Sequence, residues 1–151
     1  MAIDGLGDRF EKSCGAIVYT VEDDGIKYLL VEEAGGSHSF PKGHMENGET
    51  ERETALREIR EETDLEVSLI DDFRISEQYR PAEKPGVAKQ VVYFLAEYTD
   101  ESPRVIRPDE VRSLKSLCLE DALAVLDHED RKTILLQADE YIKGIRGQER
   151  E

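Results

Sequence analysis

The stretch that most constrains the fold runs from Phe40 to Leu65 and reads FPKGHMENGETERETALREIREETDL. Its proline and glycines are typical of an extended entry and a tight loop, and residues 50–63 have the periodicity of an amphipathic helix. At about 100° per residue, one arc of this helix is mostly apolar and is predicted to face the core. That arc consists of Arg52, Ala55, Leu56, Ile59 and Thr63.

The adjoining arc of the same helix is acidic and carries Glu51, Glu58, Glu61 and Glu62. Like charges one turn apart, such as Glu58 and Glu62, destabilise a helix by roughly a few tenths of a kcal/mol per pair. One interpretation is a solvated acidic face, helped by ion pairs to Arg57. The other is a site for a cation that prefers oxygen ligands, such as Mg²⁺, Mn²⁺ or Ca²⁺.

The whole arrangement resembles the Nudix box, the metal-binding loop and helix of Nudix hydrolases. One position departs from the motif, because Asp64 stands where the family has glycine. That glycine would end the helix in the left-handed conformation, which Asp tolerates better than most residues. The positions that match the motif are Gly43, Glu49, Arg57, Glu58, Ile59, Glu61, Glu62 and Leu65.

The resemblance implies an enzyme that hydrolyses a pyrophosphate bond with a divalent metal, Mg²⁺ or alternatively Mn²⁺. It also implies that Glu58, Glu61 and Glu62 are catalytic and ligate the metal, with the Gly43 carbonyl completing the set of ligands. Which glutamate acts as general base stays open, because carboxylates around one metal share their titration.

Two further expectations concern the surroundings of these carboxylates. Glu49 and Arg57 are expected to pin the loop to the helix, the alternative being a surface ion pair. Glu97 continues one face of the apolar strand predicted at residues 88–98. It is either an edge position at the end of the strand or, as the family suggests, another metal ligand.

The flanking residues resemble the asymmetric diadenosine tetraphosphate hydrolases of this family, and the resemblance covers residues 13–142. It implies phosphate contacts from Lys42, His44 and Lys89 and stacking of Tyr79 on a base. The alternatives are solvated lysines, a histidine that caps the loop and a buried aromatic anchor. The chain has no tryptophan, although related enzymes have one at two nearby positions, so another nucleotide or an inositol pyrophosphate stays open.

The predicted function is metal-dependent hydrolysis of a nucleoside diphosphate-linked compound, with diadenosine tetraphosphate, cleaved to ATP and AMP, as the leading substrate. Alternative substrates are a nucleotide-sugar, ADP-ribose, a diphosphoinositol phosphate or a 5′-triphosphate RNA end. A non-catalytic Nudix domain that senses a nucleotide or mediates protein contacts is the alternative of another class. The three retained glutamates favour an active enzyme.

Length and charge limit the partners. The 151 residues predict one domain spanning residues 1–151, with a core from about 13 to 142 and a flexible tail at 144–151. The net charge of −15 argues against a nucleic-acid surface but not against a small nucleotide polyphosphate. Neither a membrane-spanning run nor a secretory leader is recognised, so we expect a cytoplasmic protein with no membrane partner. The oligomeric state stays open.

Strand-like and helical segments alternate in mixed order, which predicts an α/β or α+β fold. The resemblance refines this to the Nudix fold, a mixed β-sheet sandwiched between helices (αβα) with the motif helix on one face. Strands are expected at 13–19, 27–32, 66–70, 72–78, 88–98 and 111–119, and helices at 50–63, from 119 and at 130–145.

Overall fold

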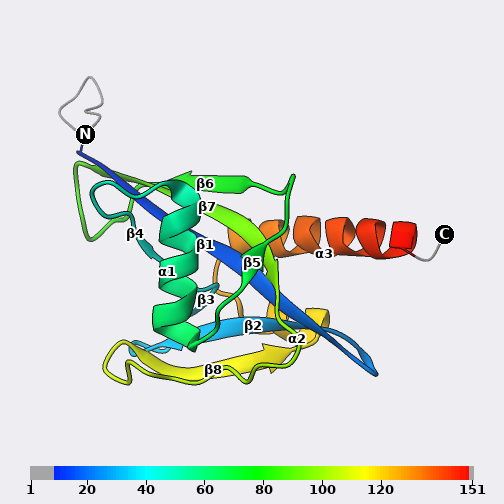
Figure 1. Cartoon of the computed structure of the whole chain (residues 1–151). Helices are drawn as coiled ribbons and strands as arrows, with labels where there is room; N and C mark the ends of the chain where they lie inside the picture. Colours follow the sequence, from blue (N-terminus) through cyan, green and yellow to red (C-terminus); the bar gives the residue numbers. More distant parts are fainter. Residues whose placement is uncertain (1–8, 150–151) are drawn as a thin grey trace.

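The computed structural model describes residues 9–149 and contains a mixed sheet with helices on both faces (Figure 1). The strands are β1 (Arg9–Glu22), β2 (Gly25–Glu33), β3 (His38–Ser39), β4 (Lys42–His44), β5 (Ser68–Leu69), β6 (Ile75–Tyr79), β7 (Val87–Glu97) and β8 (Val111–Leu117). The helices are α1 (Glu51–Thr63), α2 (Leu119–Val125) and α3 (Glu129–Glu149).

The sheet has the strand order β3–β2–β1–β7–β5, and β4, β6 and β8 pair with β1, β7 and β2, respectively. β1 and β7 run parallel and form the centre of the sheet, while the other pairs are antiparallel. The predicted mixed sheet is confirmed.

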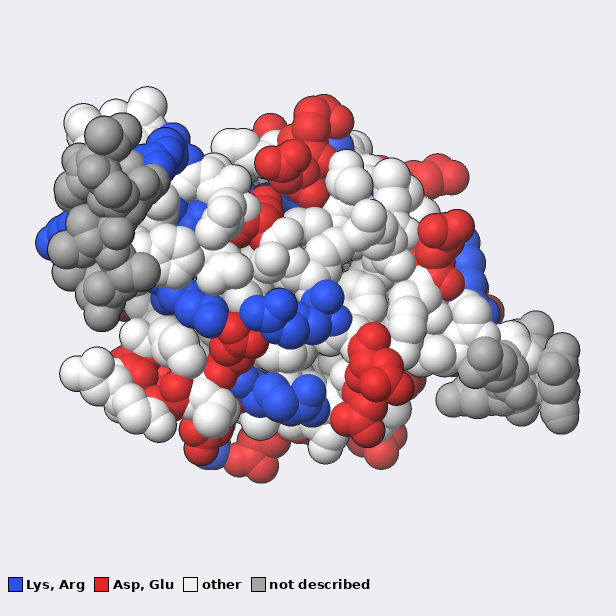
Figure 2. All heavy atoms as spheres, turned by 90° about the horizontal axis from the view of Figure 1, so that it is seen from above, with Lys and Arg blue, Asp and Glu red and all other residues white. Residues whose placement is uncertain are grey.

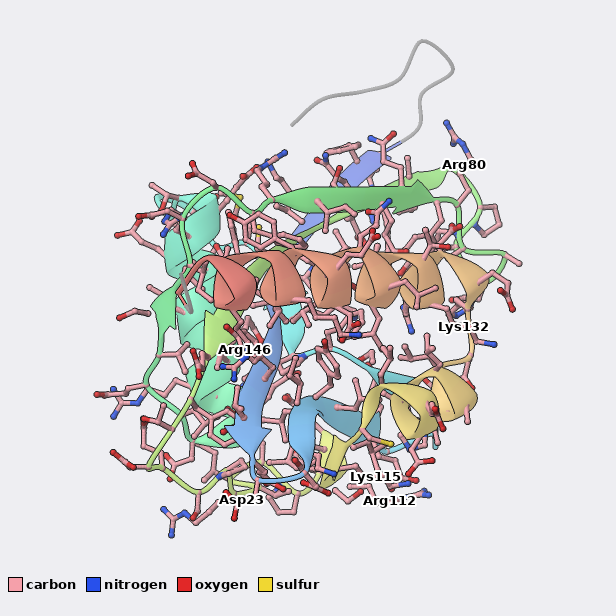
Figure 3. All side chains as sticks on the ribbon, turned by 90° about the vertical axis from the view of Figure 1, so that its right-hand side faces the viewer. Asp23, Arg80, Arg112, Lys115, Lys132 and Arg146 are labelled. Carbon is pink, nitrogen blue, oxygen red and sulfur yellow. The ribbon has the colours of Figure 1, made fainter. Side chains whose placement is uncertain are left out.

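Alternation along β7 divides the core into two layers, because successive side chains of a strand point to opposite faces. Tyr93 and Leu95 pack with residues of α2 and α3. Val92 and Phe94 pack with residues of α1 on the other face. α3 lies across its face of the sheet with α2 beside it (Figure 3). The αβα sandwich is therefore present, and within residues 9–149 the motif helix covers one face while α2 and α3 cover the other.

Both ends of α1 are fixed by local hydrogen bonds. At the start, Thr50 and Glu53 form a capping box, in which each side chain accepts from the other residue's backbone N–H. At the end, Asp64 adopts the left-handed conformation with φ 62°, and its N–H donates to the carbonyl of Arg60 at 2.9 Å. The sequence therefore predicted this helix and its unusual terminator correctly.

The buried face of α1 differs from the predicted arc. Thr54 is buried together with Ala55, Ile59 and Thr63, whereas Leu56 is 37% exposed. Arg52 is also exposed and lies over the ring of Phe94. Compared with the predicted orientation, α1 is therefore turned about its own axis. The turn buries the edge of the helix next to its acidic arc, so glutamates of that arc face the protein. This orientation brings Glu58 and Glu62 to β4 and to the cavity beside it.

Other boundaries differ modestly. β1 is longer than the predicted strand, and α3 continues past Gly144 to Glu149, where a flexible tail was expected. Residues 1–8 and 150–151 lie outside the described part of the chain. Each helix within residues 9–149 is too short or too polar to cross a bilayer.

The acidic surplus is unevenly spread over the surface. On the face seen from above, Lys and Arg side chains gather near the middle, with Asp and Glu between and around them (Figure 2). Local cations of this kind can bind anions even when the net charge is strongly negative.

The rotation of α1 predicts unequal effects of truncating two neighbouring apolar residues. Ile59→Ala should lower the free energy of unfolding by ~2–4 kcal/mol, because Ile59 is fully buried. Leu56→Ala should lower it by less than ~1 kcal/mol, because that side chain is partly in water. Urea unfolding of both variants measures the two values, and equal losses would show that the predicted arc, not the observed one, faces the core.

Candidate active site

A cavity of about 320 Å³ opens where β4, α1, the start of β7 and the segment 99–110 meet. Its volume lies in the range of small-molecule sites, roughly 300–1,000 Å³. The sequence-predicted residues that line it are Lys42, Gly43, His44, Glu58, Glu62, Tyr79 and Lys89. Its wall is completed by Ser13, Glu46, Val91, Arg107 and Glu110.

The short strand β4 brings its backbone directly against the carboxylates of α1. β4 is held by antiparallel pairing to β1, where Gly43 lies opposite Cys14. A Cβ at Gly43 would overlap the carboxylate of Glu58, so any other residue here would displace that carboxylate from the strand. The backbone N–H of Lys42 donates to Oε1 of Glu62 at 3.0 Å. Both carboxylates therefore face the same strand and the same cavity.

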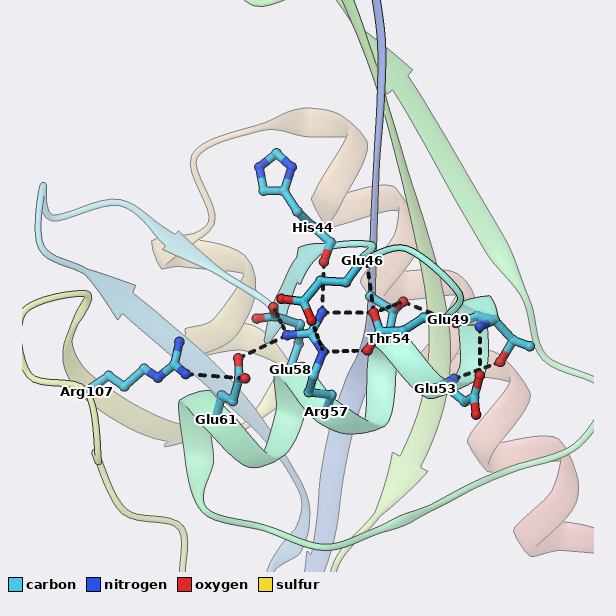
Figure 4. A network of polar contacts seen from close by, with 10 residues as sticks. His44, Glu46, Glu49, Glu53, Thr54, Arg57, Glu58, Glu61 and Arg107 are labelled. Atoms are coloured by element: carbon cyan, nitrogen blue, oxygen red, sulfur yellow. Dashed lines mark hydrogen bonds and ion pairs between the residues drawn. The ribbon is translucent and has the colours of Figure 1, made fainter. Parts of the chain in front are cut away.

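Arg57 joins the loop before α1 to the helix itself (Figure 4). Its Nε donates to Oε2 of Glu49 at 2.6 Å, and its Nη2 donates to Oε1 of Glu49 at 3.0 Å and to the carbonyl of His44 at 2.9 Å. Its Nη1 donates to Glu58 at 2.8 Å and to Glu61 at 3.1 Å. The hydrogen bonds from Arg57 lower the pKa of Glu49 to about 2. The expected contact of Glu49 with Arg57 is present, and it is bidentate.

Glu61 lies beside the cavity rather than in its wall. Its carboxylate is held between Nη1 of Arg57 at 3.1 Å and Nη2 of Arg107 at 3.3 Å. Figure 4 shows Arg107 reaching Glu61 from the segment that precedes β8. Of the three predicted carboxylates, Glu58 and Glu62 thus face the cavity and Glu61 stands at its rim.

Burial disfavours the ionised forms of both carboxylates in the cavity. It raises the pKa of Glu62 to about 8, an effect that the charge of Glu58 increases and the Lys42 N–H opposes. Burial likewise raises the pKa of Glu58, against the opposing hydrogen bond from Arg57. Two neighbouring carboxylates in such a place are stabilised as anions only when positive charge is near.

The donor set fits a hard divalent cation, which prefers oxygen ligands. Carboxylate oxygens of Glu58, Glu62 and Glu110 share one cavity with Gly43. Within residues 9–149, no three His, Cys, Asp or Glu side chains are already gathered in a metal-binding arrangement. Arg57 accounts for part of this, since it engages Glu58 and Glu61. The fit therefore rests on the chemistry of the donors and on the raised pKa values of Glu58 and Glu62.

Cationic side chains lie in the same cavity as these carboxylates. Burial lowers the pKa of Lys42; Glu33 opposes this shift, and the charge of Arg131 adds to it. Nζ of Lys89 lies 3.9 Å from Oε1 of Glu11, a loose contact that leaves it in the wall of the cavity. The imidazole of His44 points away from the Arg57 contacts (Figure 4). An anion entering here would meet several positive groups.

Glu97 is not brought to this cavity, which corrects its expected role as a metal ligand. It lies ~20 Å farther along β7 than Val91 at the usual rise per residue. Its Oε1 accepts a hydrogen bond from the Tyr19 hydroxyl at 3.4 Å. Alternation predicted the face of the strand correctly, but that face is opposite to α1. Glu97 therefore occupies the edge position at the end of the strand, which was the alternative to a metal ligand.

Sequence reasoning missed Arg107 and Glu110, which reach the cavity from the loop before β8. No periodic pattern marks them, because only the folded chain brings that loop to α1. It also missed a smaller cavity of about 90 Å³ that shares Tyr79 with the first. The other residues that line this smaller cavity are Glu77, His128, Asp130 and Arg131.

The sequence contained a feature that could have identified Arg131 as a buried residue. It occupies the apolar face of α3, one turn before Ile134 and Leu135, and is only 7% exposed. Its Nη1 donates to the carbonyl of His38 at 3.4 Å, and its Nε lies 3.8 Å from Glu77. An arginine among the apolar positions of a helix is seldom buried unless it is paired, so Arg131 could have been identified as a buried charge with specific contacts.

Comparison with known proteins decides the family. The NUDIX domain matches residues 12–137. The chain is a member of the NUDIX family. It is 32% identical over 142 residues to the asymmetrical bis(5'-nucleosyl)-tetraphosphatase of Mus musculus, covering 87% of this chain and 95% of the relative. It is 30% identical over 145 residues to the mitochondrial Nudix hydrolase 16 of Arabidopsis thaliana, covering 87% and 79%.

The structure of this Nudix hydrolase resembles solved members of the family. A C. elegans Ap4A hydrolase binary complex superposes with a TM-score of 0.81 at 25% identity, covering 89% of this chain and 98% of that one. The predicted family, fold and enzymatic class are therefore confirmed. Hydrolases of this family depend on divalent metals in general.

The raised pKa of Glu62 predicts how stability changes with pH when no divalent cation is bound. The group binds its proton more tightly when folded, so its contribution is full below pH 4.5 and is lost as pH rises toward 8. Glu62→Gln removes this titration. Relative to that variant, the wild type should lose roughly 3 kcal/mol of unfolding free energy between pH 5 and pH 8.

Urea unfolding at several pH values in the presence of a chelator measures this difference. A gap between wild type and Glu62→Gln that stays constant from pH 5 to pH 8 contradicts the assignment of a buried, destabilised carboxylate. Glu66→Gln is the control, because Glu66 is exposed and pairs with Arg60 at the surface.

Proposed function

We propose that this Nudix hydrolase cleaves a pyrophosphate bond of a dinucleoside polyphosphate in the presence of Mg²⁺, with diadenosine tetraphosphate giving ATP and AMP. The observation that carries the proposal is the single cavity that holds Glu58 and Glu62 together with Lys42 and Lys89. Carboxylates suit a divalent cation, and the lysines suit the phosphates that accompany it.

Glu58 and Glu62 would hold the metal, with Glu61 at the rim and the Gly43 carbonyl as further oxygen donors, and Mn²⁺ fits the same donors. When bound, such a cation polarises phosphoryl oxygens and lowers the pKa of a water molecule. Arg57 keeps Glu58 and Glu61 in place through its Nη1. Without that anchor, the two carboxylates would move apart by mutual repulsion.

The lysines bind and orient the phosphate chain. Lys42 lies in β4, whose position is fixed by pairing to β1, and Lys89 lies in β7 opposite Tyr79. Both lysines belong to strands rather than loops, so the backbone from which their side chains reach the cavity is held in place by the sheet. His44 lines the same wall and supplies a further donor.

Tyr79 supports a nucleoside site beside the phosphate site. Its ring forms part of both cavities, and burial raises the pKa of its hydroxyl. A base stacked on this ring would extend its phosphates toward Lys42 and Lys89. The names of the similar proteins, a tetraphosphatase in Mus musculus and an Ap4A hydrolase in C. elegans, favour the same substrate class.

A substrate panel tests the proposed activity. Diadenosine tetraphosphate should be turned over faster than nucleotide-sugars, ADP-ribose, nucleoside triphosphates and inositol pyrophosphates, and a chelator should abolish turnover. Product analysis by anion-exchange chromatography should show ATP and AMP in equal amounts. A faster rate with another panel member would replace the substrate, and symmetrical products would contradict the cleavage position.

The carboxylate assignment predicts a loss of turnover without a loss of fold. Glu62→Gln and Glu58→Gln should each lower kcat by about 10²-fold or more, because the amide cannot supply a negative charge to the cation. Circular dichroism and thermal unfolding establish that both variants are folded. The matched control is Glu66→Gln, which should keep wild-type turnover, and unchanged activity of Glu62→Gln would remove that residue from the site.

A further inference from the structure

The segment 99–110, between β7 and β8, contributes to the cavity although it lies far from the motif in sequence. Arg107 and Glu110 from this segment line the cavity. Neither residue is in a helix or strand. On the β8 side, the carbonyl of Arg107 accepts from the N–H groups of Glu110 and Val111 at 3.0 and 2.9 Å. The contacts of Arg104, three residues earlier, fix the segment on the α1 side.

Arg104 is attached to the end of α1 through both its side chain and its backbone. Its Nε and Nη2 donate to Oδ2 of Asp64 at 3.1 and 2.7 Å. Its backbone N–H donates to the carbonyl of Thr63 at 2.8 Å. We refer to these contacts of Arg104 with Thr63 and Asp64 as the clasp. The clasp satisfies a carbonyl at the helix end, which would otherwise lack an intrahelical partner.

Asp64 is the position at which the chain departs from the family motif, where glycine stands. A non-glycine residue in the left-handed conformation is strained by about 1 kcal/mol. Glycine would relieve that strain, but it has no side chain with which to bind Arg104. The carboxylate of Asp64 thus gives the chain a contact that the motif glycine cannot make.

The N–H groups of the Arg107 guanidinium make only long contacts with neighbouring carboxylates. Its guanidinium lies 3.3 Å from Oε1 of Glu61 and 3.6 Å from Oε2 of Glu110, both longer than a short charge-assisted hydrogen bond. Its side chain is 44% exposed and forms part of the cavity wall beside Lys42 and Lys89. A planar guanidinium in this position matches the bidentate geometry of a phosphate group.

We propose that Asp64 and Arg104 are positioning residues: the clasp fastens the segment 99–110 to the end of α1 and holds the Arg107 guanidinium at the mouth of the cavity, where it binds the phosphate chain of the substrate. This inference rests on the proposed function of the cavity. It adds a third phosphate-binding cation and a reason for aspartate at the motif's glycine position.

The expected effects are graded by the strength of each contact. A charge-assisted hydrogen bond from Arg107 to phosphate is worth about tenfold or more in binding, so Arg107→Met should raise KM about tenfold. Arg104 is 71% exposed and Asp64 31%, so their ion pair is a weak one. Breaking it with Asp64→Asn or Arg104→Met should raise KM about three- to fivefold. In all three variants kcat should stay within about threefold of wild type.

Two further variants separate positioning from stability. Asp64→Gly restores the motif residue and relieves the strained backbone, so it should be at least as stable as wild type in thermal unfolding, yet show the raised KM of Asp64→Asn. Arg60→Met is the matched control: Arg60 lies in the same last turn of α1 and pairs with Glu66 rather than with the segment 99–110. Its KM should equal that of wild type.

A double-mutant cycle tests whether the clasp acts through Arg107. In the Arg107→Met background, adding Asp64→Asn should leave KM unchanged, because the group being positioned is gone. Additive effects, or a normal KM in Asp64→Asn, overturn the proposal. The cycle is run with whichever substrate the wild type turns over fastest. A wrong substrate assignment would therefore show up in the substrate panel, whereas a wrong role for Arg107 would show up in the cycle.

Limited proteolysis tests the clasp without any turnover. Thermolysin should cut the segment before Val105 or Ile106 several times faster in Asp64→Asn and Asp64→Gly than in wild type, because a released segment opens more often. Arg60→Met should be cut at the wild-type rate. Equal cutting rates in all four proteins, mapped by mass spectrometry, contradict the fastening role of Asp64.

Discussion

The Arg57 guanidinium is the interaction on which the site depends. It binds Glu49 and the carbonyl of His44 on one side and Glu58 and Glu61 on the other, so one planar group fixes the loop, the helix and two carboxylates together. Its charge also offsets part of the repulsion within the acidic arc of α1. The capping box at Thr50 and the left-handed residue after Thr63 fix the length of the helix that presents these groups.

The rotation of α1 explains why part of the acidic arc faces the cavity rather than water. A helix that buried the whole predicted arc would direct its glutamates to water. Here Thr54 is buried in place of Leu56, and Glu58 and Glu62 meet β4. Glycine at position 43 is needed for the same reason, since a side chain there would occupy the space of the Glu58 carboxylate.

The sequence predicted what is local and missed what depends on the packing of distant segments. Periodicity located α1, and the family resemblance implied its terminator Asp64 and the contact of Glu49 with Arg57. Alternation identified the face of Glu97, which it shares with the cavity-lining Val91. It could not say where along β7 the cavity lies, and Glu97 stands at the far end of the strand. Arg107 was missed because a loop without periodicity carries no signal until the chain folds. The family resemblance supplied the chemistry and could not supply the contacts of Arg107 with α1 and the cavity.

The raised pKa of Glu62 implies that burial keeps this carboxyl protonated at pH 7 until a divalent cation binds. Isothermal titration of Mg²⁺ at pH 7, in buffers with different ionisation enthalpies, counts the protons released on binding. With the pKa of Glu62 raised to about 8, the wild type should release close to one proton per bound ion at pH 7 and far fewer near pH 9. Binding at pH 7 with no proton released, or with the same release in Glu62→Gln, would contradict the account.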